Sequence, residues 1–252
     1  MHADGSIEAF ERTAQTVALP IGIDTDAFGY MARAASRSRS LARLKASIAE
    51  RSLIIGIDRL DYSKGLPERF AAFEHLLRHH PENRRRTTFL QIAPLTRADV
   101  PAYSQIRREL EAETGRINGE FAEFDWVPIR YLNRSLQHRT VSGFLRYAAV
   151  GLITPLRDGM NLVAKEYVAA QNPRDPGVLI LSEFAGAAEE LDGALIVNPY
   201  DIEGVARAMR RALDLPLEER IERWRGMFER IRVNDISSWR DRYLNALKAV
   251  PI

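Results

Sequence analysis

Short apolar runs alternate with longer amphipathic segments along almost the whole chain. The runs that predict β-strands lie at 15–20, 52–57, 87–93, 127–131, 149–154, 178–182 and 194–197. The runs LIIGI, VGLIT and VLIL are apolar almost without interruption, which is typical of strands buried on both faces. Because strands that alternate with helices usually pair in parallel, the pattern predicts an α/β fold with a single Rossmann-like, doubly wound parallel sheet.

The segments between the strands carry apolar residues at the spacing of one helix face. The clearest is 66–80, where the apolar stripe consists of Leu66, Phe70, Phe73 and Leu77. Three C-terminal helices are predicted at 201–214, 217–232 and 235–249. Their aromatic residues at helical spacing, from Trp224 to Tyr243, indicate packing against the fold. The polar stretch RAASRSRS at 33–40 is expected to be a solvated loop.

Composition and charge exclude several classes of protein. The chain has 252 residues, no cysteine and a net charge of +2, so disulfides and thiolate metal sites are excluded. The first residues, MHADGSIEAFERTAQ, lack the pattern of a signal peptide, and no run approaches the roughly 20 apolar residues that span a bilayer. We therefore expect a cytoplasmic protein without a membrane partner. The cluster RRR at 84–86 is isolated, which argues against a nucleic-acid partner.

The turns that follow the predicted strands are the natural place for a site. In open parallel sheets, ligands bind beyond the carboxyl ends of the strands. Four such turns are rich in charged residues, glycine or proline, at 58–65, 94–99, 155–161 and 183–187.

The first of these turns, DRLDYSKG, carries two cations. Arg59 and Lys64 precede Gly65, which opens the next predicted helix. A guanidinium and an ammonium beside the positive end of a helix suit a diphosphate. The alternative is a surface loop in which the two cations pair with Asp58 and Asp61.

The third turn, RDGMN, leads into the helical sequence LVAKE. Gly159 lets the backbone approach a ligand closely, and Asn161 is a helix cap whose first free N–H groups, at 160–163, face an anion. Glu166 lies about one turn into this helix, where a carboxylate can accept hydrogen bonds from a ribose diol. The alternative is an ordinary turn followed by solvent-facing helix residues.

Missing motifs narrow the chemistry further. The sequence has no G-x-x-x-x-G-K-[ST], no G-x-G-x-x-G, no G-x-S-x-G and no histidine pair at metal-ligand spacing. Arg97 follows another predicted strand, and the turn SEFAGA at 182–187 could face a sugar or a base. The prediction that remains is a site that binds a phosphate group without a metal motif.

Eight motifs of the chain, taken together, resemble the trehalose-6-phosphate synthases. They run in order through the sequence as PIGID, RLDYSKGLPERF, QIAPLTRADV, GRINGEF, YLNRSL, GLITPLRDGMNLVAKEYVAAQ, SEFAGAAEEL and ALIVNPYD. The resemblance extends from about residue 15 to 249. It implies the C-terminal, donor-binding half of a GT-B fold, in which two Rossmann-like domains enclose the active site.

The resemblance implies a retaining hexosyltransferase that moves glucose from UDP-glucose to glucose 6-phosphate and gives α,α-trehalose 6-phosphate. Members of this family use neither metal nor cofactor, and the departing phosphate oxygen takes the acceptor's proton. Arg59 and Lys64 would hold the diphosphate, Asp158 would bind the transferred glucose, and Arg97 would bind the acceptor phosphate. Leu136 would present its backbone to the base. The donor-binding stretch would comprise Gly159, Met160, Asn161, Leu162, Val163, Ala164, Lys165 and Glu166.

Two features depart from the family pattern. His138 stands about where an arginine is usual, and we expect the acceptor domain that should precede the sequence VALPIGID to be absent. We expect a donor domain at 15–232 and a crossover helix at 233–252, with no activity unless an acceptor domain is supplied. Alternatives are a non-catalytic nucleotide-sugar binding or regulatory domain and a transferase with another acceptor. UDP, GDP and ADP remain open as donor nucleotides, and so does assembly into a homo-oligomer.

Overall fold

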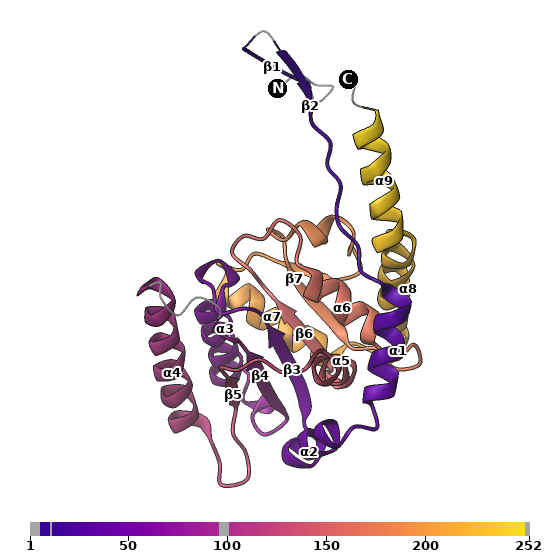
Figure 1. Ribbon diagram of the computed structural model, residues 1–252. Helices are drawn as coiled ribbons and strands as arrows, with labels where there is room; N and C mark the ends of the chain where they lie inside the picture. Colours follow the sequence, from indigo (N-terminus) through magenta and orange to yellow (C-terminus); the bar gives the residue numbers. More distant parts are fainter. Residues whose placement is uncertain (1–5, 11, 96–100, 250–252) are drawn as a thin grey trace.

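The computed structural model describes residues 6–10, 12–95 and 101–249. At its centre lies a sheet of six parallel strands in the order β5-β4-β3-β6-β7-β8, which confirms the predicted α/β fold (Figure 1). The strands are β3 Ser52–Ile57, β4 Thr87–Ile92, β5 Ile129–Leu132, β6 Val150–Ile153, β7 Val178–Ser182 and β8 Leu195–Val197.

The order of the strands reverses between β3 and β6. From β3 the sheet grows through β4 to β5 at one edge, and the chain then returns to β6 and grows through β7 to β8 at the other edge. At such a reversal the two connections leave toward opposite faces of the sheet, which opens a crevice at the carboxyl ends of the strands. The loops at this point are 58–65, after β3, and 154–161, after β6.

Helices cover both faces of the sheet (Figure 1). One face is covered by α1 Thr25–Ala35, α2 Arg39–Ile48, α5 His138–Tyr147, α6 Leu162–Ala170 and α8 Leu217–Val233. The other is covered by α3 Leu66–His79, α4 Pro101–Phe121 and α7 Ile202–Asp214. Short 3-10 turns follow at η1 Tyr62–Lys64, η2 Pro81–Asn83 and η3 Gly186–Glu189. Within the described ranges, no helix combines the length and the apolar character needed to cross a membrane.

The strands supply side chains to two separate cores. In β3, Leu53 and Ile55 belong to the core under α1 and α5, whereas Ile54 belongs to the core under α3. Successive residues of a strand point to opposite faces, so a strand covered on both sides must be apolar at every position. This requirement explains why the buried strands appear in the sequence as uninterrupted apolar runs.

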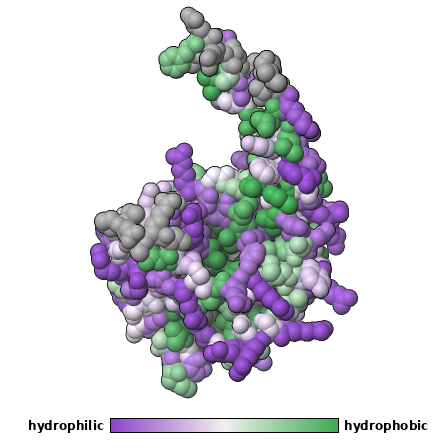
Figure 2. All heavy atoms as spheres, viewed as in Figure 1, coloured by the Kyte–Doolittle hydropathy of each residue, from purple (hydrophilic) through white to green (hydrophobic). Residues whose placement is uncertain are grey.

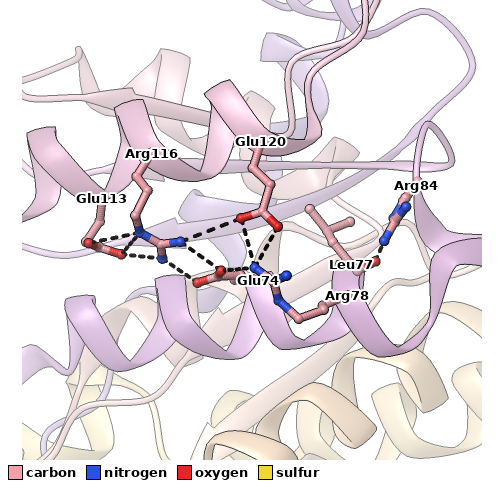
Figure 3. Close-up of polar contacts among 7 residues, drawn as sticks. All are labelled: Glu74, Leu77, Arg78, Arg84, Glu113, Arg116 and Glu120. Atoms are coloured by element: carbon pink, nitrogen blue, oxygen red, sulfur yellow. Dashed lines mark hydrogen bonds and ion pairs between the residues drawn. The ribbon is translucent and has the colours of Figure 1, made fainter.

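Charged side chains tie α4 to α3 on the outside of the second core (Figure 3). The Arg116 guanidinium binds Glu74 of α3 and also Glu113 of its own helix. Arg78 of α3 binds both Glu74 and Glu120. Hydrogen bonds from Arg116 and then Arg78 lower the pKa of Glu74 to about 2 despite partial burial. Glu74 is therefore the centre of the network.

Two segments project together from the domain (Figure 1). The indole N–H of Trp239, in α9 Ile236–Lys248, donates to the Leu19 carbonyl at 3.1 Å. Gly22 lies so close to Asn234 and Asp235 that a Cβ atom would collide with their backbone. In Figure 2, apolar surface continues from the front of the domain onto the projecting segment. Among its exposed apolar residues are Val17 and Leu247, at 62% and 59%.

The structure corrects a predicted strand and a predicted loop, and it confirms the predicted C-terminal helices. The strand predicted at 15–20 is wrong, because the pairing there is a hairpin of β1 Ser6–Ala9 with β2 Arg12–Gln15, and 16–20 continues as exposed or half-buried chain outside the sheet. The loop predicted at 33–40 shrinks to a short turn, because Ser38 caps α2 by accepting from the Leu41 N–H. The three C-terminal helices are confirmed as α7, α8 and α9.

Candidate functional site

The two loops at the reversal point are in direct contact. The Leu156 N–H donates to the Ser63 carbonyl at 2.8 Å. Gly65 ends the first loop with φ at +65°, and a Cβ atom there would collide with the Thr154 carbonyl of the second loop. Glycine is required at this position on both counts, because a left-handed conformation and a close backbone approach each disfavour a side chain. The first loop is thereby fixed against the second.

An ion pair joins the predicted residues of the two loops. The Lys64 ammonium lies 2.6 Å from Oδ2 of Asp158, and the two side chains are 13% and 18% exposed. The Asn161 amide donates to the same carboxylate at 3.1 Å. The sequence left open a pairing of Lys64 with Asp58 or Asp61; the structure instead pairs it with a residue of the other loop.

The neighbouring acidic residues have partners of their own. Asp58 binds Arg69 at 2.6 Å. Asp61 accepts from the backbone N–H and hydroxyl of Ser63, and these bonds outweigh burial and lower its pKa. Arg59 is exposed and makes no hydrogen bond or ion pair with its side chain to any residue in the described part of the chain. Its guanidinium is therefore available to a ligand.

The start of α6 faces this pair. Asn161 is the N-cap, with φ at +78°, and its side-chain oxygen accepts from the Ala164 N–H at 3.2 Å. This confirms the predicted cap and leaves the N–H groups of Leu162 and Val163 without an acceptor among the described residues. Free N–H groups and the helix dipole together create an electropositive position beside Lys64.

The loop after β7 supports the turn before α6 through backbone hydrogen bonds. The Gly186 N–H donates to the Asp158 carbonyl at 3.0 Å, and the Ala187 N–H donates to the Met160 carbonyl at 2.8 Å. The loop after β7, which the sequence suggested as a possible ligand contact, therefore acts through these bonds as a backbone support. A Cβ atom at Gly159 would meet open space, so no described protein atom accounts for the glycine.

Glu166 lies one turn into α6 and faces α5. Its carboxylate is 3.4 Å from Nε2 of His138, and its side chain is 20% exposed. Burial raises the pKa of Glu166, and the nearby His138 opposes that rise. Leu136 is half-buried in the loop just before α5. The structure thus brings His138, where the family usually has an arginine, into contact with the predicted ribose carboxylate.

Arg69 is a positioning residue of the candidate site that the sequence reading missed. It is fully buried, and its guanidinium binds Asp58 at 2.6 Å, Thr154 at 2.9 Å and the Lys64 carbonyl at 2.9 Å. Its bond to the carbonyl therefore holds the backbone of Lys64 in place. A signal was present, since Arg69 follows Leu66 by three residues and falls on the apolar stripe of its helix.

The Lys165 side chain lies away from the site. It is fully buried, and its ammonium lies 2.8 Å from the Ile21 carbonyl and 2.7 Å from Glu190. Its charge therefore cannot reach a donor from this position, and a role in donor binding remains a prediction only for its backbone. Arg97 lies outside the described residues. Among those residues, no cluster of three or more histidine, aspartate or glutamate side chains has the geometry to hold a metal ion.

The arrangement is suited to holding a charged phosphate group. Lys64 and Arg59 supply cations, the start of α6 supplies free N–H groups, and Asp158 and Glu166 supply carboxylates that can accept from hydroxyls. All five features lie at the carboxyl ends of β3 and β6 or on the helices that follow. A sugar nucleotide has the complementary groups, since its diphosphate lies between the hydroxyls of the ribose and those of the sugar.

Comparison with known proteins gives a consistent result. The profile described as glycosyltransferase family 20 matches residues 1–249. A curated relative from Sinorhizobium fredii, named trehalose-6-phosphate synthase, is 53% identical over 97% of this chain and 53% of its own length. A relative of the same name from Cronobacter sakazakii is 51% identical over 98% of this chain and 52% of its own length. The chain thus spans about half the length of the curated relatives it matches.

Solved structures agree with the relatives. An α,α-trehalose-phosphate synthase (UDP-forming) from Burkholderia xenovorans, in complex with glucose-6-phosphate, is 55% identical and has a TM-score of 0.95, covering 97% of this chain and 54% of its own. An Escherichia coli structure described as bound with UDP-2-fluoro glucose is 47% identical with a TM-score of 0.94, covering 100% of this chain and 56% of its own.

Proposed function

Because this chain belongs to glycosyltransferase family 20, we propose that it forms the donor-binding half of a UDP-forming α,α-trehalose-phosphate synthase. The complete enzyme would transfer glucose from UDP-glucose to glucose 6-phosphate with retention of configuration. The observation that carries the proposal is the pairing of Lys64 with Asp158 beside the free N–H groups of α6. Solved relatives bound to glucose-6-phosphate and to a fluorinated UDP-glucose support the two substrates.

Each group of the donor has a matching group in the site. Lys64 and Arg59 would hold the diphosphate from one side, and the N–H groups at 162–163 would hold it from the other. Glu166 would accept hydrogen bonds from the ribose diol. Asp158 would accept them from the transferred glucose.

The remaining contacts rest on the family pattern. The backbone of Leu136 would meet the base, and Arg97 would bind the acceptor phosphate. No cofactor or metal takes part in the proposed reaction. The protein would instead contribute orientation of the substrates and stabilisation of the negative charge on the departing UDP.

The proposed reaction needs an acceptor domain. The projecting segments, residues 15–20 and α9, carry exposed apolar side chains that a further domain would cover. We propose that transfer occurs only when such a domain closes over the carboxyl ends of the strands, because the acceptor must lie on the same face of the sugar as the leaving diphosphate. The domain boundary predicted at residue 232 and the crossover role of α9 are part of this proposal.

Calorimetry on the chain itself tests the donor site. UDP is expected to bind, and Lys64→Ala is expected to weaken binding by roughly ten- to a hundredfold, because the ammonium supplies a charge-assisted hydrogen bond. Lys45→Ala, on α2, is the matched control and should leave UDP affinity unchanged. Equal UDP affinity in the two variants would contradict the proposal. Parallel titrations with GDP and ADP would establish the preferred base.

The full reaction is tested in a protein that also contains an acceptor domain. Lys64→Ala in that protein is expected to lose most transfer from UDP-glucose, and UDP release coupled to formation of trehalose 6-phosphate is the measurement. Normal transfer by the variant would refute the role of Lys64. UDP binding without any transfer by the unmodified protein would instead favour a binding or regulatory domain.

A further inference from the structure

A cavity separate from the strand-end site opens where α2, α5 and the edge of the sheet meet. Its volume is about 380 Å³, which lies within the range of small-molecule sites. Its lining residues come from α2, β4, β5, the loop after β5 and α5. The site described above uses the ends of β3 and β6 instead, and only Leu136 belongs to both regions.

The charged residues that line this cavity are all cations. Arg43 projects from α2, Arg130 from β5 and Arg134 from the loop after β5. The lining contains no aspartate or glutamate. Arg43 and Arg134 are exposed, and neither side chain makes a hydrogen bond or ion pair with any other residue that the structure describes. Two guanidinium groups therefore face the cavity region without a counter-ion.

The third guanidinium is held in a fixed position. Arg130 donates through both terminal nitrogens to Ser47, at 2.6 Å to its hydroxyl and 2.6 Å to its carbonyl. Both of these partners are neutral, so the charge is not cancelled. Burial and then the positive charge of Arg51 lower the pKa of Arg130. A guanidinium nevertheless stays protonated in proteins, so Arg130 keeps its charge. An anion in the cavity would relieve this accumulation of positive charge.

The floor of the cavity is apolar. Leu44, Leu90, Leu132, Leu136 and Phe144 form it. A hydrated inorganic ion gains nothing from such a surface, whereas a ligand with an apolar or aromatic body buries it. Ser40, Ser47 and Thr140 add hydroxyls at the wall, which can donate to further oxygens.

We propose that this cavity binds a small phosphate monoester with an apolar or aromatic body, as a second ligand site distinct from the donor site. The phosphate would lie among Arg43, Arg130 and Arg134. A guanidinium can donate two parallel hydrogen bonds to the oxygens of one phosphate, and the positive charges of these arginines would compensate the two negative charges of the monoester. The body of the ligand would lie against the leucines and Phe144.

Binding is tested with phenyl phosphate, using inorganic phosphate and phenol as partial probes. The measurements use Lys64→Ala as the background, so that the proposed donor site contributes little to the signal. Phenyl phosphate is expected to bind about tenfold or more tightly than either partial probe, because only it uses both the cations and the floor. Adding Arg43→Ala and Arg134→Ala should lower its affinity tenfold or more. Both residues are exposed, so these variants are expected to fold.

A matched control tests whether binding depends on the arginines of the cavity or on any positive charge of the same helix. Arg39→Ala removes an exposed arginine at the start of the same helix but outside the cavity, and it should leave phenyl phosphate binding unchanged. Amide NMR shifts confined to α2, β5 and α5 would support the assignment. The proposal is overturned if phenyl phosphate binds no better than phosphate, or if Arg39→Ala matches the effect of Arg43→Ala. Either result is independent of UDP binding, so it leaves the donor-site proposal standing.

Discussion

Replacing Arg69 by methionine should destabilise the fold more than any surface charge change. The guanidinium is fully buried and donates to Asp58, Thr154, Gln91 and the Lys64 carbonyl. Methionine fills much of the same space but donates no hydrogen bond. The Asp58 carboxylate, also buried, would then lose the only cation that contacts it among the described residues.

The magnitude follows from the burial of this pair. Removing one partner of a buried ion pair costs about 3–5 kcal/mol, because the other charge is left without compensation. For a chain of this size that corresponds to a fall in Tm of roughly 10 °C. Arg78→Met is the matched control on the same helix. Its side chain is 46% exposed, so the loss of its surface ion pairs should lower the stability far less.

The loss should also depend on pH. Burial raises the pKa of Asp58, and Arg69 is the main influence that opposes the rise. Without Arg69 the folded-state pKa rises further above the unfolded value of about 4. Well below the unfolded value the carboxyl is neutral in both the folded and the unfolded state, so the loss of stability then comes only from the other hydrogen bonds of Arg69. The loss grows as the pH rises toward the folded-state pKa of Asp58 in the variant.

Urea unfolding at about pH 4.5 and about pH 7.5 provides the measurement. The free energy of unfolding should differ more between Arg69→Met and the unmodified chain at the higher pH. Adding Asp58→Asn to Arg69→Met removes the buried charge and should abolish this pH dependence. The reasoning is refuted if Arg69→Met costs no more than Arg78→Met, or if its deficit is the same at both pH values.

Three further variants test the network on α3 and the cap of α6. Because the pKa of Glu74 is lowered to about 2, its contribution is present above the unfolded value of about 4.5 and disappears as the pH falls through 2. Glu74→Gln should therefore cost about 1 kcal/mol at neutral pH, since its arginine partners are half-exposed, and nothing near pH 2; a constant difference in acid titrations of unfolding would contradict this. Asn161→Ala should cost about 2 kcal/mol in thermal unfolding, from the lost cap and the positive φ. Asn161→Gly should cost less because glycine accepts that φ, and equal losses would show that backbone strain plays no part.

Most strands and helices were predicted correctly from the sequence, because the residues that determine them are neighbours in the chain. The run LIIGI became β3 since both faces of that strand are buried, and Asn161 was identified as a cap because capping involves residues three positions apart. The hairpin before residue 16 was missed. Its two strands, SIEA and RTAQ, are only four residues long and contain few apolar residues, so the pattern pointed to the more apolar residues just after them.

The side chains that were missed depend on distant partners. Arg69 binds Thr154, 85 residues away, and Lys165 binds the Ile21 carbonyl, 144 residues away. A sequence shows that such a residue is charged, but not toward which element it points. Lys165 stands next to Glu166 in the chain, yet its side chain leaves α6 on the buried side, because neighbouring residues of a helix project about 100° apart.

The ion pair between Lys64 and Asp158 sets a condition on the proposed donor site. The same ammonium would have to serve the Asp158 carboxylate and the diphosphate, and the 2.6 Å contact leaves it with two further donors. A lysine, which carries three donors on a flexible stem, can bridge two anions without breaking the first contact. Arg69 makes this feasible, since it holds the Lys64 backbone in place while the side chain reaches outward. We infer that the pair orients the ammonium before the donor arrives, and that Asp158 then accepts from sugar hydroxyls through Oδ1, the oxygen that Lys64 does not contact.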